Sequence, residues 1–237
     1  MRIDGRFNGP PNSAHGGVAC GVFAGAADSR QATVRLTAPP PLDTDLEVAD
    51  GPGGWKVVNG PQGPVGRARP WEVPAELGPL PRVDDEHIAE GHAWWRENMF
   101  DSHAFPACFG CGHERPSGDG LFLYPGVVAG SEYKADTWTP GDGETDDWWV
   151  WAAVDCPSGW GTMASGEVSA ELAPMVLGEL SLSISTSPRV GVEYQVVARP
   201  AGQDGRKLRS DVALVAPDGE NIARGRSIWI RLAEVPS

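Results

Sequence analysis

The residues best suited to chemistry stand in a short run, Asn12-Ser13-Ala14-His15-Gly16-Gly17, directly before an apolar segment. Paired glycines let a ligand approach the backbone closely. If a helix begins here, its free amides could hold an oxygen that becomes negative during acyl transfer. The same run is also typical of a helix start that packs tightly on a sheet, with His15 as a hydrogen-bonded turn residue. It therefore predicts either an oxyanion hole or a packing contact.

A second candidate is Asp155, which stands inside the mostly apolar segment 146–162. An apolar environment raises the pKa of a carboxyl group toward the range useful to a general base at neutral pH. Alternatively, the following Cys156-Pro157-Ser158-Gly159 could begin a turn, with Asp155 capping the end of a helix. Both interpretations are open at the level of sequence.

The chain has four cysteines, too few and too unevenly spaced for a disulfide framework, so we expect reduced thiols. Cys108 and Cys111, followed by His113, suggest zinc, because thiolates and imidazole are zinc ligands. No second cysteine pair follows at a suitable spacing, and we therefore predict no metal site. Cys20 and Cys156 lie in apolar segments and are expected to be small core residues.

Two motifs carry a resemblance to a known family. Phe7-Asn8-Gly9-Pro10-Pro11-Asn12 with His15-Gly16-Gly17 resembles the helix-start motif of PaaI-like hot-dog thioesterases. Cys108-Phe109-Gly110-Cys111-Gly112, leading to Gly120-Leu121-Phe122-Leu123, is similar to the opening of many hot-dog domains of this kind. In that family a glycine amide polarises the thioester carbonyl, and an acidic residue further along the same helix activates water.

This sequence departs from the family pattern, because Ala24 stands where the first half should carry the acidic residue. The second half has Asp155 but no His-Gly-Gly. The resemblance therefore implies one composite site between the halves, in which the amides of Gly16 and Gly17 face Asp155. Asn12 and His15 would orient the substrate or water.

A helix followed by an antiparallel meander is predicted twice. In the first half a helix over 12–28 precedes short strands at 32–36, 46–48, 55–58 and 65–68. A helix over 84–98, capped by Asp84 or Asp85, separates the halves. The elements predicted for the second half are strands at 121–124 and 133–139, a helix over 146–162, and strands at 176–185, 190–198, 207–216 and 222–232.

This repeat predicts an α+β fold, a tandem double hot-dog in which each antiparallel sheet wraps a central hydrophobic helix. We expect an N-terminal hot-dog unit at 1–80, a helical connector at 81–104 and a C-terminal hot-dog unit at 105–237. Trp148, Trp149, Trp151 and Trp160 are expected in the core, with the lining of an acyl pocket as the alternative.

The charge narrows the range of partners. With 32 acidic and 19 basic residues the formal charge is -13, which repels nucleic acids and anionic membranes, so we expect neither as a partner. The same charge repels coenzyme A, for which the basic stretch 199–209 is a candidate contact. No run of eighteen apolar residues and no apolar signal segment is present, and we expect a cytoplasmic protein.

The predicted function is thioesterase-like hydrolysis of an acyl-CoA or acyl-carrier-protein thioester. No cofactor is expected, since coenzyme A would enter only as part of the substrate. The tandem form predicts a monomeric pseudo-dimer or a homodimer. The main alternative is a catalytically inactive hot-dog protein that binds an acyl or aromatic ligand. A dehydratase or isomerase is disfavoured, because no helix carries the paired Asp and His that hydratases use.

Overall fold

The computed structural model describes residues 1–163 and 173–235. Its helices are α1 (Gly16–Ala24), α2 (Asp85–Asn98) and α3 (Asp147–Trp160). The strands are β1 (Gln31–Leu36), β2 (Glu47–Asp50), β3 (Lys56–Gly60), β4 (Gly63–Pro70), β5 (Lys134–Trp138), β6 (Met175–Ile184), β7 (Tyr194–Asp204), β8 (Lys207–Val215) and β9 (Asn221–Arg231). None of the helices in these described parts is long and apolar enough to cross a membrane.

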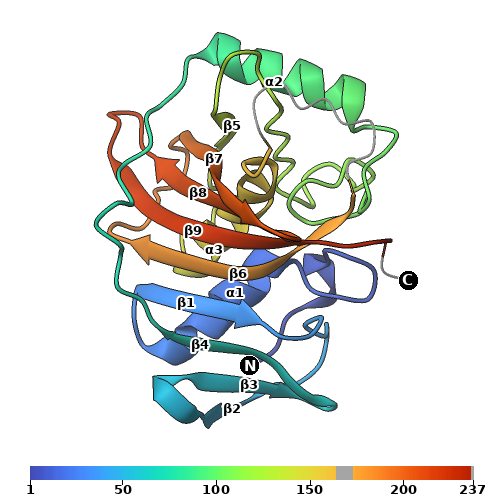
Figure 1. Cartoon of the computed structure of the whole chain (residues 1–237), viewed down its shortest axis with the longest axis vertical. Coiled ribbons are helices and arrows are strands. Elements are labelled where there is room, and N and C mark those ends of the chain that lie inside the picture. Colours follow the sequence, from blue (N-terminus) through green and yellow to red (C-terminus); the bar gives the residue numbers. More distant parts are fainter. Residues whose placement is uncertain (164–172, 236–237) are drawn as a thin grey trace.

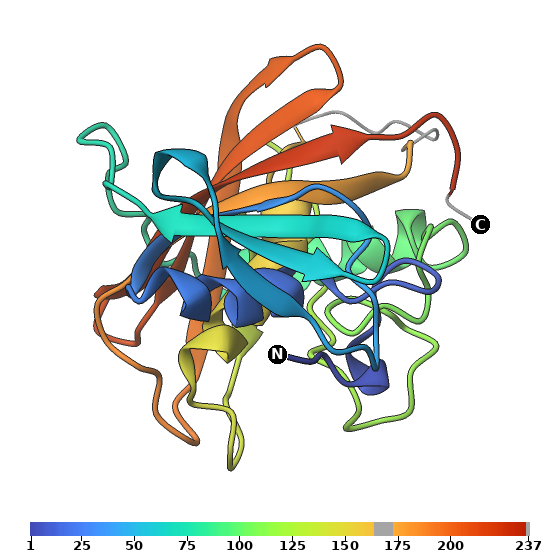
Figure 2. The ribbon, with the colours of Figure 1, turned by 90° about the horizontal axis from the view of Figure 1, so that it is seen from below.

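The strands form one antiparallel sheet in the order β2-β3-β4-β1-β6-β9-β8-β7-β5. The helices α1 and α3 lie side by side on the same side of it (Figure 2), and α2 lies at the end of the molecule opposite β2 (Figure 1). The strand that follows each central helix occupies the middle of the sheet, where β1 pairs with β6 and places Val34 opposite Leu180. On the outer side of β1 lies β4, and on the outer side of β6 lies β9, so the strands of each half extend outward from the centre of the sheet.

The junction between the halves is polar on one face and apolar on the other. Thr33 and Ser181 lie opposite each other, and their hydroxyl oxygens are 2.7 Å apart and buried. Val34 and Leu180, one residue further along, are fully buried in the core. The helix-plus-meander repeat expected from the sequence is therefore present, and its two sheets are joined into one.

The backbones of α1 and α3 touch because α1 presents glycines to α3. A Cβ at Gly17 would lie 2.4 Å from the carbonyl oxygen of Trp151, and one at Gly21 would lie 2.7 Å from the Cα of Trp148. Real Cβ atoms essentially never approach other atoms so closely. The helix start thus serves the packing role that the sequence offered as an alternative, and the close approach also brings side chains of α3 to the start of α1.

The helix α3 continues through Pro157 to Trp160, so Asp155 lies inside it and does not cap its end. Proline lacks an amide hydrogen, so the Ala153 carbonyl oxygen one turn earlier loses its usual helical donor. The Ser158 hydroxyl donates to the Asp155 carbonyl oxygen at 2.7 Å and accepts from the Trp229 indole at 2.9 Å. The last turn is therefore tied to β9, which fixes the backbone that carries Asp155.

The helix α1 (Gly16–Ala24) is shorter at both ends than the helix predicted over 12–28. The helix α1 begins at Gly16 instead of Asn12, because Asn12 has the left-handed φ of 56° and belongs to a turn. The cap is His15, whose amide donates to the Phe7 carbonyl at 2.7 Å and whose ring accepts from the Val18 amide. In the centre of the chain α2 begins after Asp84, as predicted.

The predicted strand at 121–124 is wrong. Phe122 has a φ of 53°, which interrupts an extended backbone. The amides of Leu121 and Leu123 donate to the carbonyl oxygens of Phe109 and Gly110, so this segment pairs with the cysteine-rich loop and not with the sheet. The strand β7 also begins later than predicted, at Tyr194 instead of residue 190, and runs on to Asp204.

The segment after α2 folds back onto the N-terminal residues. Phe109 donates its amide to the Asn8 carbonyl oxygen at 2.8 Å, and the Asn8 side chain donates to the Ala107 carbonyl at 2.8 Å. The predicted connector at 81–104 contains α2, and residue 105 lies in the long irregular segment that precedes β5. This segment brings the cysteine-rich loop beside the start of α1.

The glycine packing predicts a measurable loss of stability in Gly21→Ala. The added methyl would meet backbone and Cβ atoms of Trp148 that cannot move independently of α3. We expect a free energy of unfolding lower by about 1–3 kcal/mol in guanidinium titrations. The matched control is Gly25→Ala at the end of α1, where a Cβ would meet nothing within 4 Å. Equal stability of the two variants would contradict the close helix contact.

The helix α2 is attached to β5 through an ion pair. His92 Nε2 lies 2.8 Å from Asp136 Oδ1, and the other oxygen of Asp136 accepts the Tyr124 amide. The hydrogen bond with Asp136 raises the pKa of His92 above its ordinary value of 6.5, against the opposing effects of burial and of Arg96. The protonated imidazole is therefore favoured in the folded state.

This pair predicts a pH-dependent effect of His92→Gln. Because the folded-state pKa is raised, the stabilisation is fully present below the unfolded value of 6.5 and is lost as the pH rises through the folded value. We expect the native Tm to exceed that of the variant most at about pH 6, and the difference to shrink toward pH 8–9. In an Asp136→Asn background the pH dependence should disappear, and its persistence there would rule out Asp136 as its cause.

Candidate active site

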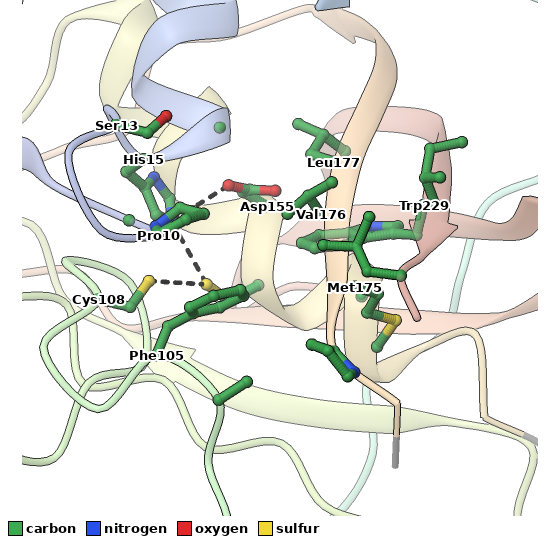
Figure 3. Close-up of a pocket in the computed structure, with 18 of the residues that line it drawn as sticks. Pro10, Ser13, His15, Phe105, Cys108, Asp155, Met175, Val176, Leu177 and Trp229 are labelled. Atoms are coloured by element: carbon green, nitrogen blue, oxygen red, sulfur yellow. Dashed lines mark hydrogen bonds and ion pairs between the residues drawn. The ribbon is translucent and has the colours of Figure 1, made fainter. Parts of the chain in front are cut away.

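A cavity of about 560 Å³ opens where α1 begins and α3 ends. The two central strands of its wall are β6 and β9, and the opposite side is formed by the turn before α1 and by the segment after α2 (Figure 3). Most of its lining is apolar, and the larger apolar side chains are Met99, Phe105, Trp160, Met175, Val176, Leu177, Trp229 and Ile230. Asp155 and His15 lie at one end of the cavity (Figure 3), and the other polar lining residues include Ser13, Thr37, Ser102 and His103.

The carboxylate of Asp155 reaches from α3 to the start of α1. Its Oδ2 accepts the Gly17 amide at 2.6 Å and lies 3.1 Å from His15 Nε2. Both side chains are 2% exposed. The other oxygen, Oδ1, is buried and has no hydrogen-bond partner among the described residues. Asp155 therefore has one oxygen that is held by α1 and one that has no hydrogen-bond partner among the described residues.

The electrostatics of this pair follow from burial. Burial raises the pKa of Asp155 to about 6, although His15 and the Gly17 amide act in the opposite direction. Burial lowers the pKa of His15, but the neighbouring Asp155 and Cys108 raise it by more in sum. Each group thus makes the charged form of the other less costly in this buried site.

The tautomer of His15 follows from its two contacts. Its Nδ1 accepts the Val18 amide at 3.4 Å, so in the neutral ring the proton lies on Nε2. That proton is directed to Asp155, and the same nitrogen lies 3.3 Å from the Cys156 sulfur. The ring also makes an edge contact with Phe109 at a centroid distance of 5.9 Å. His15 is thereby fixed in orientation as both a helix cap and a partner of Asp155.

Two thiols adjoin this histidine, and a third lies in the same buried cluster. Cys108 Sγ lies 3.8 Å from Cys156 Sγ, and Cys111 belongs to the same buried cluster. Hydrogen bonds from Cys111 and Cys156 lower the pKa of the Cys108 thiol, while the hydrogen bond to Cys108 raises the pKa of each of the other two. A negative charge in the cluster is therefore best held on Cys108. Cys20 lies elsewhere, in the core around α1.

Comparisons with known proteins identify the architecture. A scan against protein-family models and a search of curated proteins both found no match. Among solved structures, a conserved protein of unknown function with hot-dog fold from Alicyclobacillus acidocaldarius is similar over 99% of this chain and 92% of its own, with a TM-score of 0.59 and 13% identity. This chain has the hot-dog fold.

Two further structures agree with this hot-dog assignment. A candidate thioesterase II from Thermobifida fusca matches over 97% of this chain and 91% of its own, with a TM-score of 0.56 and 13% identity. The tesB protein of Mycobacterium avium subsp. paratuberculosis matches over 94% and 90%, with a TM-score of 0.56 and 9% identity. The fold predicted from the sequence motifs is therefore confirmed over nearly the whole chain.

Within the hot-dog scaffold, four of the five predicted site residues meet at one point. His15, Gly16 and Asp155 line the cavity, and Gly17 lies behind them with its amide donated to Asp155. Asn12 is exposed and stands at the rim of the cavity, in the turn before α1. Cys156 is buried, as expected, but the sequence did not indicate that it also contacts His15 and lines the cavity.

The structure also gives the positions of the α3 tryptophans and of the basic stretch 199–209. Of the tryptophans of α3, Trp160 lines the cavity, while Trp148 and Trp149 stack on each other at a centroid distance of 4.3 Å. The basic stretch lies on β7 and β8, and neither Arg199 nor Arg209 lines the cavity. Each of the two has an acidic neighbour within 3.9 Å, which offsets its charge locally.

Proposed function

We propose that this hot-dog protein hydrolyses an acyl thioester at the point where Asp155 meets the start of α1. The observation that carries the proposal is the contact of Asp155 with Gly17 and His15, since it joins the carboxylate of one half to the helix start of the other. The similar structure from Thermobifida fusca is described as a candidate thioesterase, which supports the same class of reaction.

In the proposed reaction, Asp155 Oδ1 accepts a proton from water, and the water oxygen attacks the thioester carbonyl carbon. The Gly16 amide, at the first position of α1, is assigned to the oxygen that becomes negative. Gly17 is given a positioning role instead, because its amide already holds Oδ2. The carbon–sulfur bond then breaks and the leaving sulfur takes the proton from Asp155, which yields a carboxylic acid and a thiol.

The cavity favours an apolar acyl group. Its wall of Met, Val, Leu and Trp side chains offers dispersion contacts and no charge beyond the polar end. A hydrocarbon or aromatic acyl chain would lie along this wall and present its carbonyl to Gly16. Coenzyme A or an acyl-carrier protein remains the proposed carrier, and Asn12 at the rim is positioned to contact it.

A ligand-binding protein without catalysis is the second candidate. It is favoured by the tight contact between Asp155 and Gly17, because this leaves the Gly16 amide as the single donor of the two that the sequence predicted for an oxyanion. The nearly complete burial of Asp155 points the same way, since water must reach Oδ1 through the cavity. The two candidates share the cavity and differ only in turnover.

Hydrolysis of short, medium, long and aromatic acyl-CoAs by the native protein and by Asp155→Asn separates these candidates. Asparagine keeps the shape of the side chain but does not accept a proton from water. If Asp155 is the general base, kcat should fall by at least about 100-fold. The matched control is Asp147→Asn, on the same helix but exposed and paired with Arg30, which should retain activity.

The outcomes are distinct. An equal loss of activity in both aspartate variants would indicate a stability effect instead of a catalytic one. If the native protein turns over no acyl-CoA yet binds one in calorimetry, the hydrolase proposal fails and the ligand-binding candidate replaces it.

A further inference from the structure

Three of the four cysteines converge on one buried point beside His15, although they come from distant parts of the chain. Cys108 and Cys111 belong to the loop after α2, and Cys156 belongs to α3. These three cysteines and His15 are buried, with relative exposures from 1% to 6%. A packing role alone needs apolar volume and would not require that sulfur and nitrogen donor atoms face one another.

The separations between the donor atoms match those around one metal ion. His15 Nε2, Cys108 Sγ and Cys156 Sγ lie within 4.8 Å of one another. The two sulfur atoms are 3.8 Å apart. In a tetrahedral zinc site with bonds of about 2.3 Å to sulfur, two sulfur ligands are about 3.8 Å apart. The two thiols thus already have the spacing of ligands to one ion.

A third thiol is available to complete the coordination. Cys111 belongs to the same buried cluster as Cys108 and Cys156, outside the set of donor atoms that lie within 4.8 Å of one another, and its sulfur lies 3.3 Å from His103 Nε2. Three sulfurs and one imidazole nitrogen form one of the common ligand sets of zinc. Soft sulfur ligands disfavour magnesium and calcium, which prefer oxygen.

The loop backbone is shaped around this cluster. A Cβ at Gly110 would lie 2.5 Å from the Cys156 sulfur and 2.6 Å from His15 Nε2. The Gly112 amide donates to the Cys108 carbonyl oxygen at 2.8 Å and closes the turn between the two loop cysteines. Glycine at these two positions lets the loop close over the donor atoms without obstructing the space between them.

We propose that Cys108, Cys156 and His15 form a binding site for Zn²⁺ or a similarly soft divalent cation beside the candidate active site, and that the ion draws in Cys111 as the fourth ligand. The proposal does not require thioester hydrolysis, although it shares His15 with the candidate active site, and it differs from the sequence prediction of no metal site.

The proposal has a consequence for His15. A metal ion at Nε2 requires the ring proton on Nδ1, which then gives up the long 3.4 Å hydrogen bond from the Val18 amide. His15 Nε2 also lies 3.1 Å from Asp155 Oδ2, so the cation and the carboxylate compete for this nitrogen. Metal binding would therefore release Asp155 from one of its two partners and leave the Gly17 amide as the other.

The test titrates metal-free, reduced full-length protein with Co²⁺, whose tetrahedral thiolate complexes show sulfur-to-cobalt charge transfer and d–d bands. We expect saturation at one ion per chain, displacement of Co²⁺ by Zn²⁺, and the same stoichiometry of zinc by mass spectrometry. Cys108→Ser and Cys156→Ser should each weaken binding by more than about 100-fold, since loss of an outer-shell partner alone costs 10–100-fold. Cys20→Ser is the matched control, because Cys20 is buried outside the cluster.

Circular dichroism of the metal-free variants checks that they fold. If a serine variant does not fold, the native protein still decides the question through its cobalt spectrum and zinc content. Absence of sulfur-to-cobalt charge transfer in the native protein, or equal Co²⁺ affinity in the native and folded serine variants, would overturn the proposal. The readout uses no thioester, so its failure and the failure of the proposed hydrolysis are separate results.

Discussion

The buried carboxylate of Asp155 is the interaction on which the arrangement of the two halves depends. A carboxylate removed from water is costly unless polar groups replace its solvent. Here the Gly17 amide and His15 supply that replacement from the other half of the chain. They reach Asp155 only because the backbones of α1 and α3 touch, and that contact needs glycine where α1 meets Trp148 and Trp151. Glycine at position 17 therefore serves two purposes: it allows the helices to touch, and its amide binds Asp155.

The sheet follows from this helix contact. Because α1 and α3 lie together, the strands that leave their ends also come together, and β1 pairs with β6. The cavity opens where α1 begins and α3 ends, between the turn before α1 and the strands β6 and β9. One helix pair thus determines both the centre of the sheet and the position of the candidate site.

Much of the fold could be predicted from local patterns. Long apolar segments with turn residues between them located both central helices and most strands, and Asp155 stood out because a carboxylate is rare in such a segment. The start of α1 was missed because Asn12 is a common cap residue, whereas the left-handed turn at Asn12 and the hydrogen bond of His15 to Phe7 depend on tertiary contacts. The strand at 121–124 failed for the same reason, since Phe122 adopts a backbone conformation that its residue type rarely takes.

The assembly around His15 could not be read from spacing. His15 and Cys156 are separated by 141 positions, and neither has a neighbouring ligand-type residue at the short spacings that usually signal a site. The Cys108 and Cys111 pair was the only local signal of a metal site, and its spacing does not indicate which distant residues could supply the remaining ligands. Such a cluster becomes visible only when the loop after α2 is folded against the N-terminal turn.

The pairing of β1 with β6 also determines how the protein can be made. Arg35 on β1 pairs with Glu179, which lies 144 positions later, so the ribosome releases α1 and β1 long before their partners exist. During that interval the nascent N-terminal half has an open strand edge and an uncovered apolar helix. Such surfaces associate with other chains. The two halves therefore complete their shared sheet and helix contact only after the second half has been synthesised.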